Sequence, residues 1–209
     1  MKIKNESLSL IIVGNWNRNI FTPEWVSKNI YDTDQVQVEF PFNVIGPMRF
    51  EHQKIRLIPA SNRLLFVALD DSVETLERME SMASKIGGLL PHTPVTAFGM
   101  NFGFSETIGN NISLLSIFSI SDNEKLGEFG AEIKTCQIAR KIIIDGNTLN
   151  FSISKDTVDF VFDFNFHFDI KQLSDISTIL TGKKINQFKD LASSILKNAY
   201  DLEFQREGA

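Results

Sequence analysis

The sequence predicts an α+β fold, in which one curved antiparallel sheet carries two long helices on one face. Several segments alternate apolar and polar residues, most clearly 158–168, as strands with one buried face do. Two segments, 73–86 and 185–199, instead place apolar residues three and four positions apart, which is typical of helices that cover a core. The Asp145-Gly146 pair between two alternating segments predicts a tight hairpin, so the strands beside it should pair antiparallel.

The composition is that of a globular protein with a buried core. Of the 209 residues, 43% are apolar and 22% are charged. The single cysteine cannot form an internal disulfide, which fits a reducing compartment. A membrane helix needs about 18 apolar residues in a row, and every apolar run in the sequence is much shorter. The net charge of −5 gives no overall attraction to nucleic acid or anionic lipid. We therefore expect a cytoplasmic protein that uses neither membrane nor cofactor.

The first half predicts a strand, a short helix and four more strands. The strand over 8–14 has alternating apolar residues and stops at a glycine. Thr22 followed by Pro23 is a typical helix start, and this helix should run to about Ile30. Four extended segments follow, at 35–40, 48–53, 54–58 and 63–69.

A long helix closes the first half near residue 90. Asp71 and Glu74 have the spacing of a capping box, so the helix should begin directly after Asp71. The Gly87-Gly88 pair is expected to end it.

The second half begins with a strand over 95–104. The next segment, 112–129, fits either a buried helix or a strand, and we interpret it as helical turns. Three long strands follow, at 133–144, 149–153 and 158–168. The last helix, over 185–199, precedes a tail at 203–209 that we expect to be frayed.

The two halves share one order of elements. Each is interpreted as a strand, a helix, four strands and a helix (β-α-β4-α), although only three long strands are evident in the second. This order resembles the pseudo-two-fold TATA-binding-protein-like fold. We therefore expect a single domain over 1–209 that consists of two merged halves, about 1–90 and 91–202.

Phenylalanine is the unusual residue of this chain, with 18 Phe against 2 Tyr and 2 Trp. Five Phe alternate along 160–168 and must share one side of a strand. Phe98, Phe102 and Phe104 do the same in the strand over 95–104. Because buried rings without a hydroxyl need no hydrogen-bond partner, both Phe-bearing sides should face the core under the helices.

The opposite sides of these two strands form the candidate binding surface. One side carries polar residues between the Phe residues, and the other carries two glycines, which in a strand are typical of a close approach by backbone, ligand or partner. If the strands are neighbours, the polar residues and the glycines form a shallow polar groove. A plain solvent face, close internal packing and a bulge remain alternatives. The candidate residues are Gly99, Asn101, Gly103, Asp163, Asn165 and His167.

Motifs for catalysis or metal binding are weak. Asp163, His167 and Asp169 share a strand face, and a metal site there is conceivable, but no HxH, HExxH or CxxC spacing supports one. The GxxxxGK[ST] phosphate loop is absent. Aspartates on the open side of a saddle-shaped sheet would repel phosphate, so nucleic-acid binding is disfavoured. We assign no catalytic residue and no metal.

Three segments of the chain are similar to a known pattern. They are LIIVGNWNRNIFTPEW at 10–25, HTPVTAFGMNFGF at 92–104 and FNFHFD at 164–169. In this order they resemble a sporadically distributed family of uncharacterised bacterial proteins. The resemblance implies no activity and no catalytic residues. The patchy occurrence of that family resembles that of accessory genes or host-defence genes.

Two hypotheses for function follow. In the first, the protein is a non-enzymatic binding or assembly subunit. It engages a protein partner, or a second copy of itself, through its sheet face or a sheet edge, in a bacterial accessory or antiviral defence system. The alternative is a small-ligand or metal-dependent enzyme with a shallow groove near Asn101 and His167.

Overall fold

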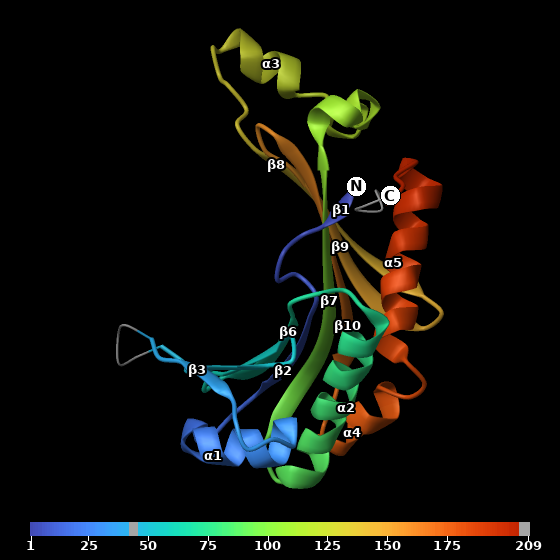
Figure 1. Ribbon diagram of the computed structural model, residues 1–209. Helices are drawn as coiled ribbons and strands as arrows, with labels where there is room; N and C mark the ends of the chain where they lie inside the picture. Colours follow the sequence, from blue (N-terminus) through green and yellow to red (C-terminus); the bar gives the residue numbers. More distant parts are fainter. Residues whose placement is uncertain (42–45, 205–209) are drawn as a thin grey trace, which may run out of the picture.

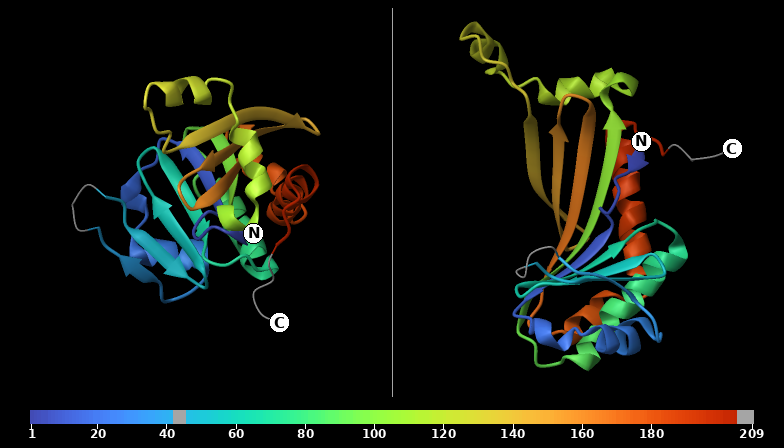
Figure 2. Two further views of the ribbon diagram at one scale, coloured as in Figure 1. Left: turned by 90° about the horizontal axis from the view of Figure 1, so that it is seen from above. Right: turned by 60° about the vertical axis from the view of Figure 1, so that its left-hand side comes forward.

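A ten-stranded antiparallel sheet forms the centre of the protein, and the long helices lie against one of its faces (Figures 1 and 2). The structure is a computed structural model that describes residues 1–41 and 46–204. The predicted α+β class, with a large antiparallel sheet and a few helices, is confirmed. The sheet is open, with β3 and β8 at its two edges.

The first half contains six strands and one long helix. Its elements are β1 (Lys2–Ile3), β2 (Ser9–Gly14), the 3-10 turn η1 (Arg18–Ile20), α1 (Pro23–Val26), the π-helical turn η2 (Ser27–Tyr31), β3 (Gln37–Glu39), β4 (Arg49–His52), β5 (Ile55–Pro59), β6 (Arg63–Ala68) and α2 (Val73–Leu89).

The second half has longer strands. Its elements are β7 (Val95–Thr107), the 3-10 turns η3 (Ile108–Asn110) and η4 (Ile112–Phe118), α3 (Asn123–Glu128), β8 (Cys136–Ile144), β9 (Asn147–Lys155), β10 (Asp159–Asp169), α4 (Ser174–Ile179) and α5 (Lys184–Tyr200). The ambiguous segment 112–129 is therefore helical, as we interpreted it.

One sheet runs through both halves, because β2 pairs with β7 at its centre. The strand order is β3-β4-β5-β6-β2-β7-β10-β9-β8, and β1 also pairs with β7. In Figure 1 the long strands of the second half run lengthwise, whereas the strands from β3 to β6 run across them, since the sheet is strongly twisted. Only three strands follow the helical turns in the second half, not four, because residues 119–135 form α3 and an irregular link instead of a strand.

Local signals located the helix termini only in part. As predicted, Thr22 caps α1, and its Oγ1 accepts a hydrogen bond from the Trp25 N–H at 3.2 Å. The predicted capping box at the start of α2 is wrong, because the Ser72 hydroxyl is the cap and accepts from the Thr75 N–H at 3.3 Å. The predicted stop at Gly87-Gly88 is also wrong, since α2 continues to Leu89.

The Phe-bearing sides of β7 and β10 form the core, as predicted. Phe160, Phe162, Phe164 and Phe166 are at most 1% exposed, and Phe98, Phe102 and Phe104 at most 2%. The rings of Phe166 and Phe188 lie 4.3 Å apart, which joins β10 to α5. Helix α2 contacts β6 and helix α5 contacts β7, so both long helices cover this side of the sheet.

The described end of the chain contacts the body of the protein. The ring of Phe204 lies 5.5 Å from that of Phe104, and Lys197 forms an ion pair with Glu203 at 3.1 Å. The rest of the predicted frayed tail, residues 205–209, lies outside the described residues. Within residues 1–41 and 46–204, every helix is too short or too polar to cross a lipid bilayer.

Candidate functional site

The two strands that carry the candidate residues are direct neighbours. β7 and β10 pair antiparallel in a register that sets Asn101 opposite Asn165 and Gly103 opposite Asp163. The same register sets Gly99 opposite His167. These residues alternate with the buried Phe residues, so they lie on the sheet face opposite α2 and α5, which we call the open face.

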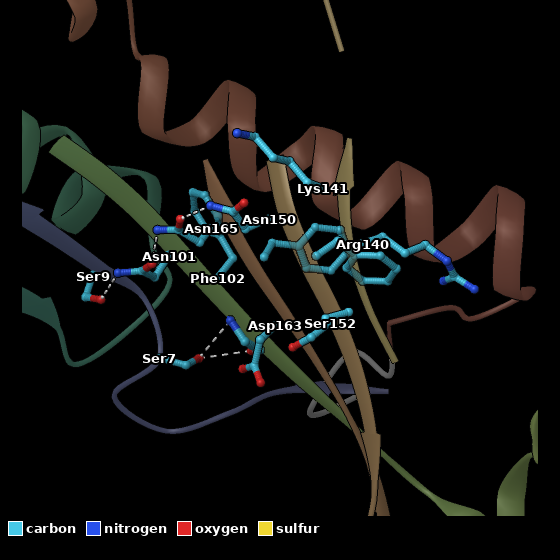
Figure 3. Close-up of a pocket in the computed structure, with 14 residues that line it drawn as sticks. Ser7, Ser9, Asn101, Phe102, Arg140, Lys141, Asn150, Ser152, Asp163 and Asn165 are labelled. Carbon is cyan, nitrogen blue, oxygen red and sulfur yellow. Dashed lines mark hydrogen bonds between the residues drawn. The ribbon is translucent and has the colours of Figure 1, made fainter. Parts of the chain in front are cut away.

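A chain of hydrogen-bonded side chains crosses the open face from β2 to β9 (Figure 3). Asn101 donates from its amide nitrogen to the Ser9 hydroxyl at 3.1 Å, and Asn165 donates to Oδ1 of Asn101 at 2.7 Å. Asn150 donates to Oδ1 of Asn165 at 2.9 Å. We call this row of four side chains the amide ladder. It fixes three side-chain amides across four strands.

A groove lies in the open face beside the amide ladder, with a cavity volume of about 600 Å³. Figure 3 shows its lining. Strands β2, β7, β10, β9 and β8, together with Ser7, contribute to it. The residues that line it are Ser7, Ser9, Asn101, Phe102, Gly103, Ala139, Arg140, Lys141, Asn150, Phe151, Ser152, Asp163, Phe164 and Asn165.

The groove exists because short side chains adjoin one another on the open face. The pairing registers place Asp163 between Gly103 and Ser152, and Ser152 opposite Ala139. A row with so little side-chain volume leaves a hollow between the longer side chains on either side. Arg140 does not fill it, since its guanidinium points to the helix side and donates to the Tyr200 hydroxyl at 3.1 Å.

Both glycines of β7 are explained by close internal packing, one of the alternatives considered for them. A Cβ atom at Gly103 would lie 2.7 Å from Cβ of Ser7, whose hydroxyl accepts from the Gly103 N–H at 3.2 Å. A Cβ atom at Gly99 would lie 2.8 Å from the Asn165 amide nitrogen and 3.0 Å from Cγ2 of Ile11. Gly99 thus provides the space into which the Asn165 side chain leans.

Four of the six candidate residues line the groove, namely Asn101, Gly103, Asp163 and Asn165. Gly99 and His167 lie in the next row of the open face, outside the lining. The His167 ring is half-buried, with Nε2 3.2 Å from the Asp169 carboxylate. In the part of the chain that the structure describes, no three His, Cys, Asp or Glu side chains gather closely enough to hold a metal ion.

Sequence reasoning missed the groove residues that other strands contribute. Asn150 and Ser152 alternate with the buried Leu149, Phe151 and Ile153, so the outward direction of their side chains was evident from the pattern. Their position beside Asn165 and Asp163 depends on the pairing of β9 with β10, which no local signal gives. The other missed residues whose side chains face the groove are Ser7, Ser9, Ala139 and Lys141.

The groove offers hydrogen bonds more than charge. Its polar side chains on the open face are amides, hydroxyls, one carboxylate at Asp163 and one ammonium at Lys141, and both charged residues are exposed. Ala139 and three Phe residues add apolar surface to the lining. Among the described residues, each ladder amide donates one of its two N–H groups, so the second can serve another acceptor. Such a surface suits an uncharged polar group, for example a peptide backbone or a side-chain amide.

Comparison with known proteins gives no match, either to the models of protein families or to curated proteins. The function must therefore be argued from the geometry of the open face.

Proposed function

We propose that this chain is a non-enzymatic binding or assembly subunit that engages a protein partner through the open face of its sheet. The observation that carries this proposal is the groove of about 600 Å³ in the open face, whose lining includes a row of hydrogen-bonding side chains. Protein–protein interfaces gain specificity from polar groups that are already held in place before the partner binds.

The amide ladder supports the proposal because it holds these polar groups in place. Asn101 and Asn165 are each fixed by two ladder hydrogen bonds, so little side-chain entropy is lost when a partner binds. A partner strand or loop presents backbone N–H and C=O groups, which match the unused N–H groups and lone pairs of the amides. Phosphate would instead meet the carboxylate of Asp163, which disfavours nucleic acid.

The arrangement of the strands supports a finer proposal about the fold. Outward from the central β2–β7 pair, the strands follow in the order β6, β5, β4 on one side and β10, β9, β8 on the other. This mirrored order supports a pseudo-two-fold, TATA-binding-protein-like arrangement in one domain of two merged halves, about 1–90 and 91–202. We further propose a cytoplasmic location and, on the sequence resemblance alone, a role in a bacterial accessory or antiviral defence system.

The test is to block the groove without disturbing the fold. Ser152→Arg places a long, charged side chain in the groove, whereas Ser81→Arg puts the same side chain on the exposed surface of α2. Tagged wild-type protein and both variants are isolated from the native host, and the masses of the intact complexes are measured. We expect a stoichiometric partner with wild type and Ser81→Arg, and its loss with Ser152→Arg. A monomer without a partner, or a partner that Ser152→Arg retains, would contradict the proposal.

A second proposal is that the groove near Asn101, with His167 in the row next to its lining, is the site of a small-ligand or metal-dependent enzyme. The cavity volume supports it, since small-molecule sites have about 300–1,000 Å³. Metal analysis of untagged protein and the ligand-induced melting shifts of wild type and His167→Ala test it. Absence of bound metal, together with melting shifts that His167→Ala leaves unchanged, would exclude this alternative.

A further inference from the structure

Strand β8 is the long free edge of the sheet. It has nine residues and, among the described residues, pairs only with β9, whereas the opposite edge strand β3 has three residues. A free edge presents unpaired backbone N–H and C=O groups, which can pair with a strand from another chain. In Figure 2 this strand lies at the border of the sheet.

The β8–β9 hairpin determines which backbone groups are free. Its turn consists of Asp145 and Gly146, both with positive φ, and joins the paired residues Ile144 and Asn147. In a two-residue hairpin this closing pair exchanges hydrogen bonds, and every second residue along the strand does the same. The residues between them direct their N–H and C=O groups outward, where no described residue bonds them. These are Gln137, Ala139, Lys141 and Ile143.

The middle of this edge is basic, although the whole chain has a net charge of −5. Arg140 and Lys141 are exposed and occupy opposite faces of β8. Neither forms an ion pair within the described part of the chain, and Arg140 has one hydrogen bond, to the Tyr200 hydroxyl at 3.1 Å. Lys141 also borders the groove. The free backbone groups and the two positive charges thus lie on the same short segment.

We propose that β8 binds an extended acidic segment of the partner protein, which adds to the sheet as a further strand. This inference rests on the proposed function, since it specifies how the partner of the open face is held. The segment's backbone bonds the free groups of β8, and neighbouring acidic residues on its two faces reach Lys141 on the open face and Arg140 on the helix side. Its remaining open-face side chains lie next to the groove.

A second copy of the chain is a poorer occupant than an acidic segment. Full overlap of two antiparallel β8 strands is centred on Arg140 and sets Arg140 opposite Arg140. Shifting the centre by one residue sets Lys141 opposite Lys141. Like charges directly opposite one another destabilise strand pairing, whereas opposite charges stabilise it.

The probe is a synthetic peptide of the length of β8, rich in threonine and valine, with two adjacent glutamates at its centre. The control peptide has lysines in place of the glutamates. Binding is followed by NMR titration and by hydrogen exchange of the backbone amides. We expect the acidic peptide to protect the amides of Gln137, Ala139, Lys141 and Ile143, and to bind roughly tenfold more tightly than the lysine peptide at low salt.

Two variants separate backbone pairing from charge. Ala139→Pro removes an outward N–H without removing a bond to β9, so it should abolish binding of the acidic peptide while the hairpin stays folded. Lys141→Glu should weaken binding of the acidic peptide and strengthen binding of the lysine peptide. Equal binding of the two peptides, or unchanged exchange at the four amides, would overturn the inference. A dimer that Ala139→Pro disperses, or protection of the same amides by single-stranded DNA, would overturn it as well.

The groove variant distinguishes a failure of this inference from a failure of the proposed function. Ser152→Arg should still bind the acidic peptide, because its edge is intact. If the native partner is recovered and lost with Ser152→Arg, but the acidic peptide does not bind, only the assignment of β8 fails. If no partner is recovered, the proposed function fails, whatever the peptide does.

Discussion

The side-chain amide of Asn165 donates to Oδ1 of Asn101 at 2.7 Å and accepts from the Asn150 amide at 2.9 Å. These contacts span three neighbouring strands on the face of the sheet opposite the helices. Asn165 is therefore the central member of the amide ladder. It is also the residue for which β7 leaves room at Gly99.

We expect Asn165→Ala to disorder the ladder without unfolding the protein. The change removes two hydrogen bonds, but water reaches this half-buried position, so the free energy of unfolding should fall by about 0.5–1.5 kcal/mol. Urea unfolding measures this. Asn150→Ala is the control at the exposed end of the ladder, where one hydrogen bond is lost and a smaller effect is expected. Equal effects would show that the ladder is not a connected unit.

Two adjacent glycines of α2 should respond in opposite ways to alanine. Gly88 has open space where a Cβ would lie, so Gly88→Ala should stabilise the helix by about 0.5–1 kcal/mol. A Cβ at Gly87 would lie 3.0 Å from the backbone oxygen of Leu173, so Gly87→Ala must push α4 away and should gain nothing or destabilise. Melting temperatures of the two variants decide this. Stabilisation by both would show that the α2–α4 contact is looser than described.

A carboxylate of α2 caps the N-terminus of α5. The buried Glu80 accepts from the Ile185 N–H at 3.1 Å, while Lys183, at the start of α5, provides no side-chain cap. Glu80→Ala leaves this buried N–H without a partner and should cost about 1–3 kcal/mol of unfolding free energy. Glu80→Gln keeps an acceptor oxygen and should cost less. Urea unfolding and hydrogen exchange at Ile185 measure both variants. Equal losses would contradict a capping role.

Asp156 should make stability depend on pH in the acid range. Its carboxylate accepts from the N–H groups of Asp159 at 2.8 Å and Val158 at 2.7 Å, in the turn between β9 and β10. These backbone hydrogen bonds, that of Asp159 first, hold the pKa of the Asp156 carboxyl below its usual value. A lowered folded-state pKa means that the stabilisation is complete above the unfolded-state pKa and is lost as pH falls through the folded-state pKa.

The measurement is the difference in unfolding free energy between wild type and Asp156→Ala. It should be constant at neutral pH and shrink as pH falls below about 4, because protonation removes the same contacts in wild type. Thr157→Ala, at the exposed neighbouring position in the same turn, is the control and should show no such dependence. A difference that acid leaves unchanged would contradict the role given to this carboxylate.

Much of the fold could be predicted because it follows from local periodicity. The alternation of Phe160 to Phe168 located β10 and its buried side, and Asp145-Gly146 located the β8–β9 turn. The wrong predictions concern helix ends whose position is determined by another element or by another side chain. Gly87 does not stop α2, since its missing side chain allows close contact with the backbone of Leu173, directly before α4. Ser72 displaces the predicted capping box, because its own hydroxyl meets the Thr75 N–H.

Sequence reasoning found only part of the candidate site. Alternation places four of the predicted residues on the open face, where they line the groove: Asn101, Gly103, Asp163 and Asn165. The sequence predicted that they lie close together only on the condition that their two strands are neighbours, which they are. His167 obeys the same alternation, yet lies one row away from the lining. A shift of one row changes which residues share a cavity. Only the pairing register of the strands determines the row in which a residue lies.

The sequence by itself determined which side of each strand is buried, because a period of two and the free energy of burying Phe are local properties of the chain. The tertiary structure alone decided that β9 and β2 flank the β7–β10 pair, and thereby joined Ser9 and Asn150 to the same ladder. It also left β8 as the free edge with Arg140 and Lys141 at its centre. The order of strands is a long-range choice among pairings that are similar locally, so no segment of the sequence specifies it alone.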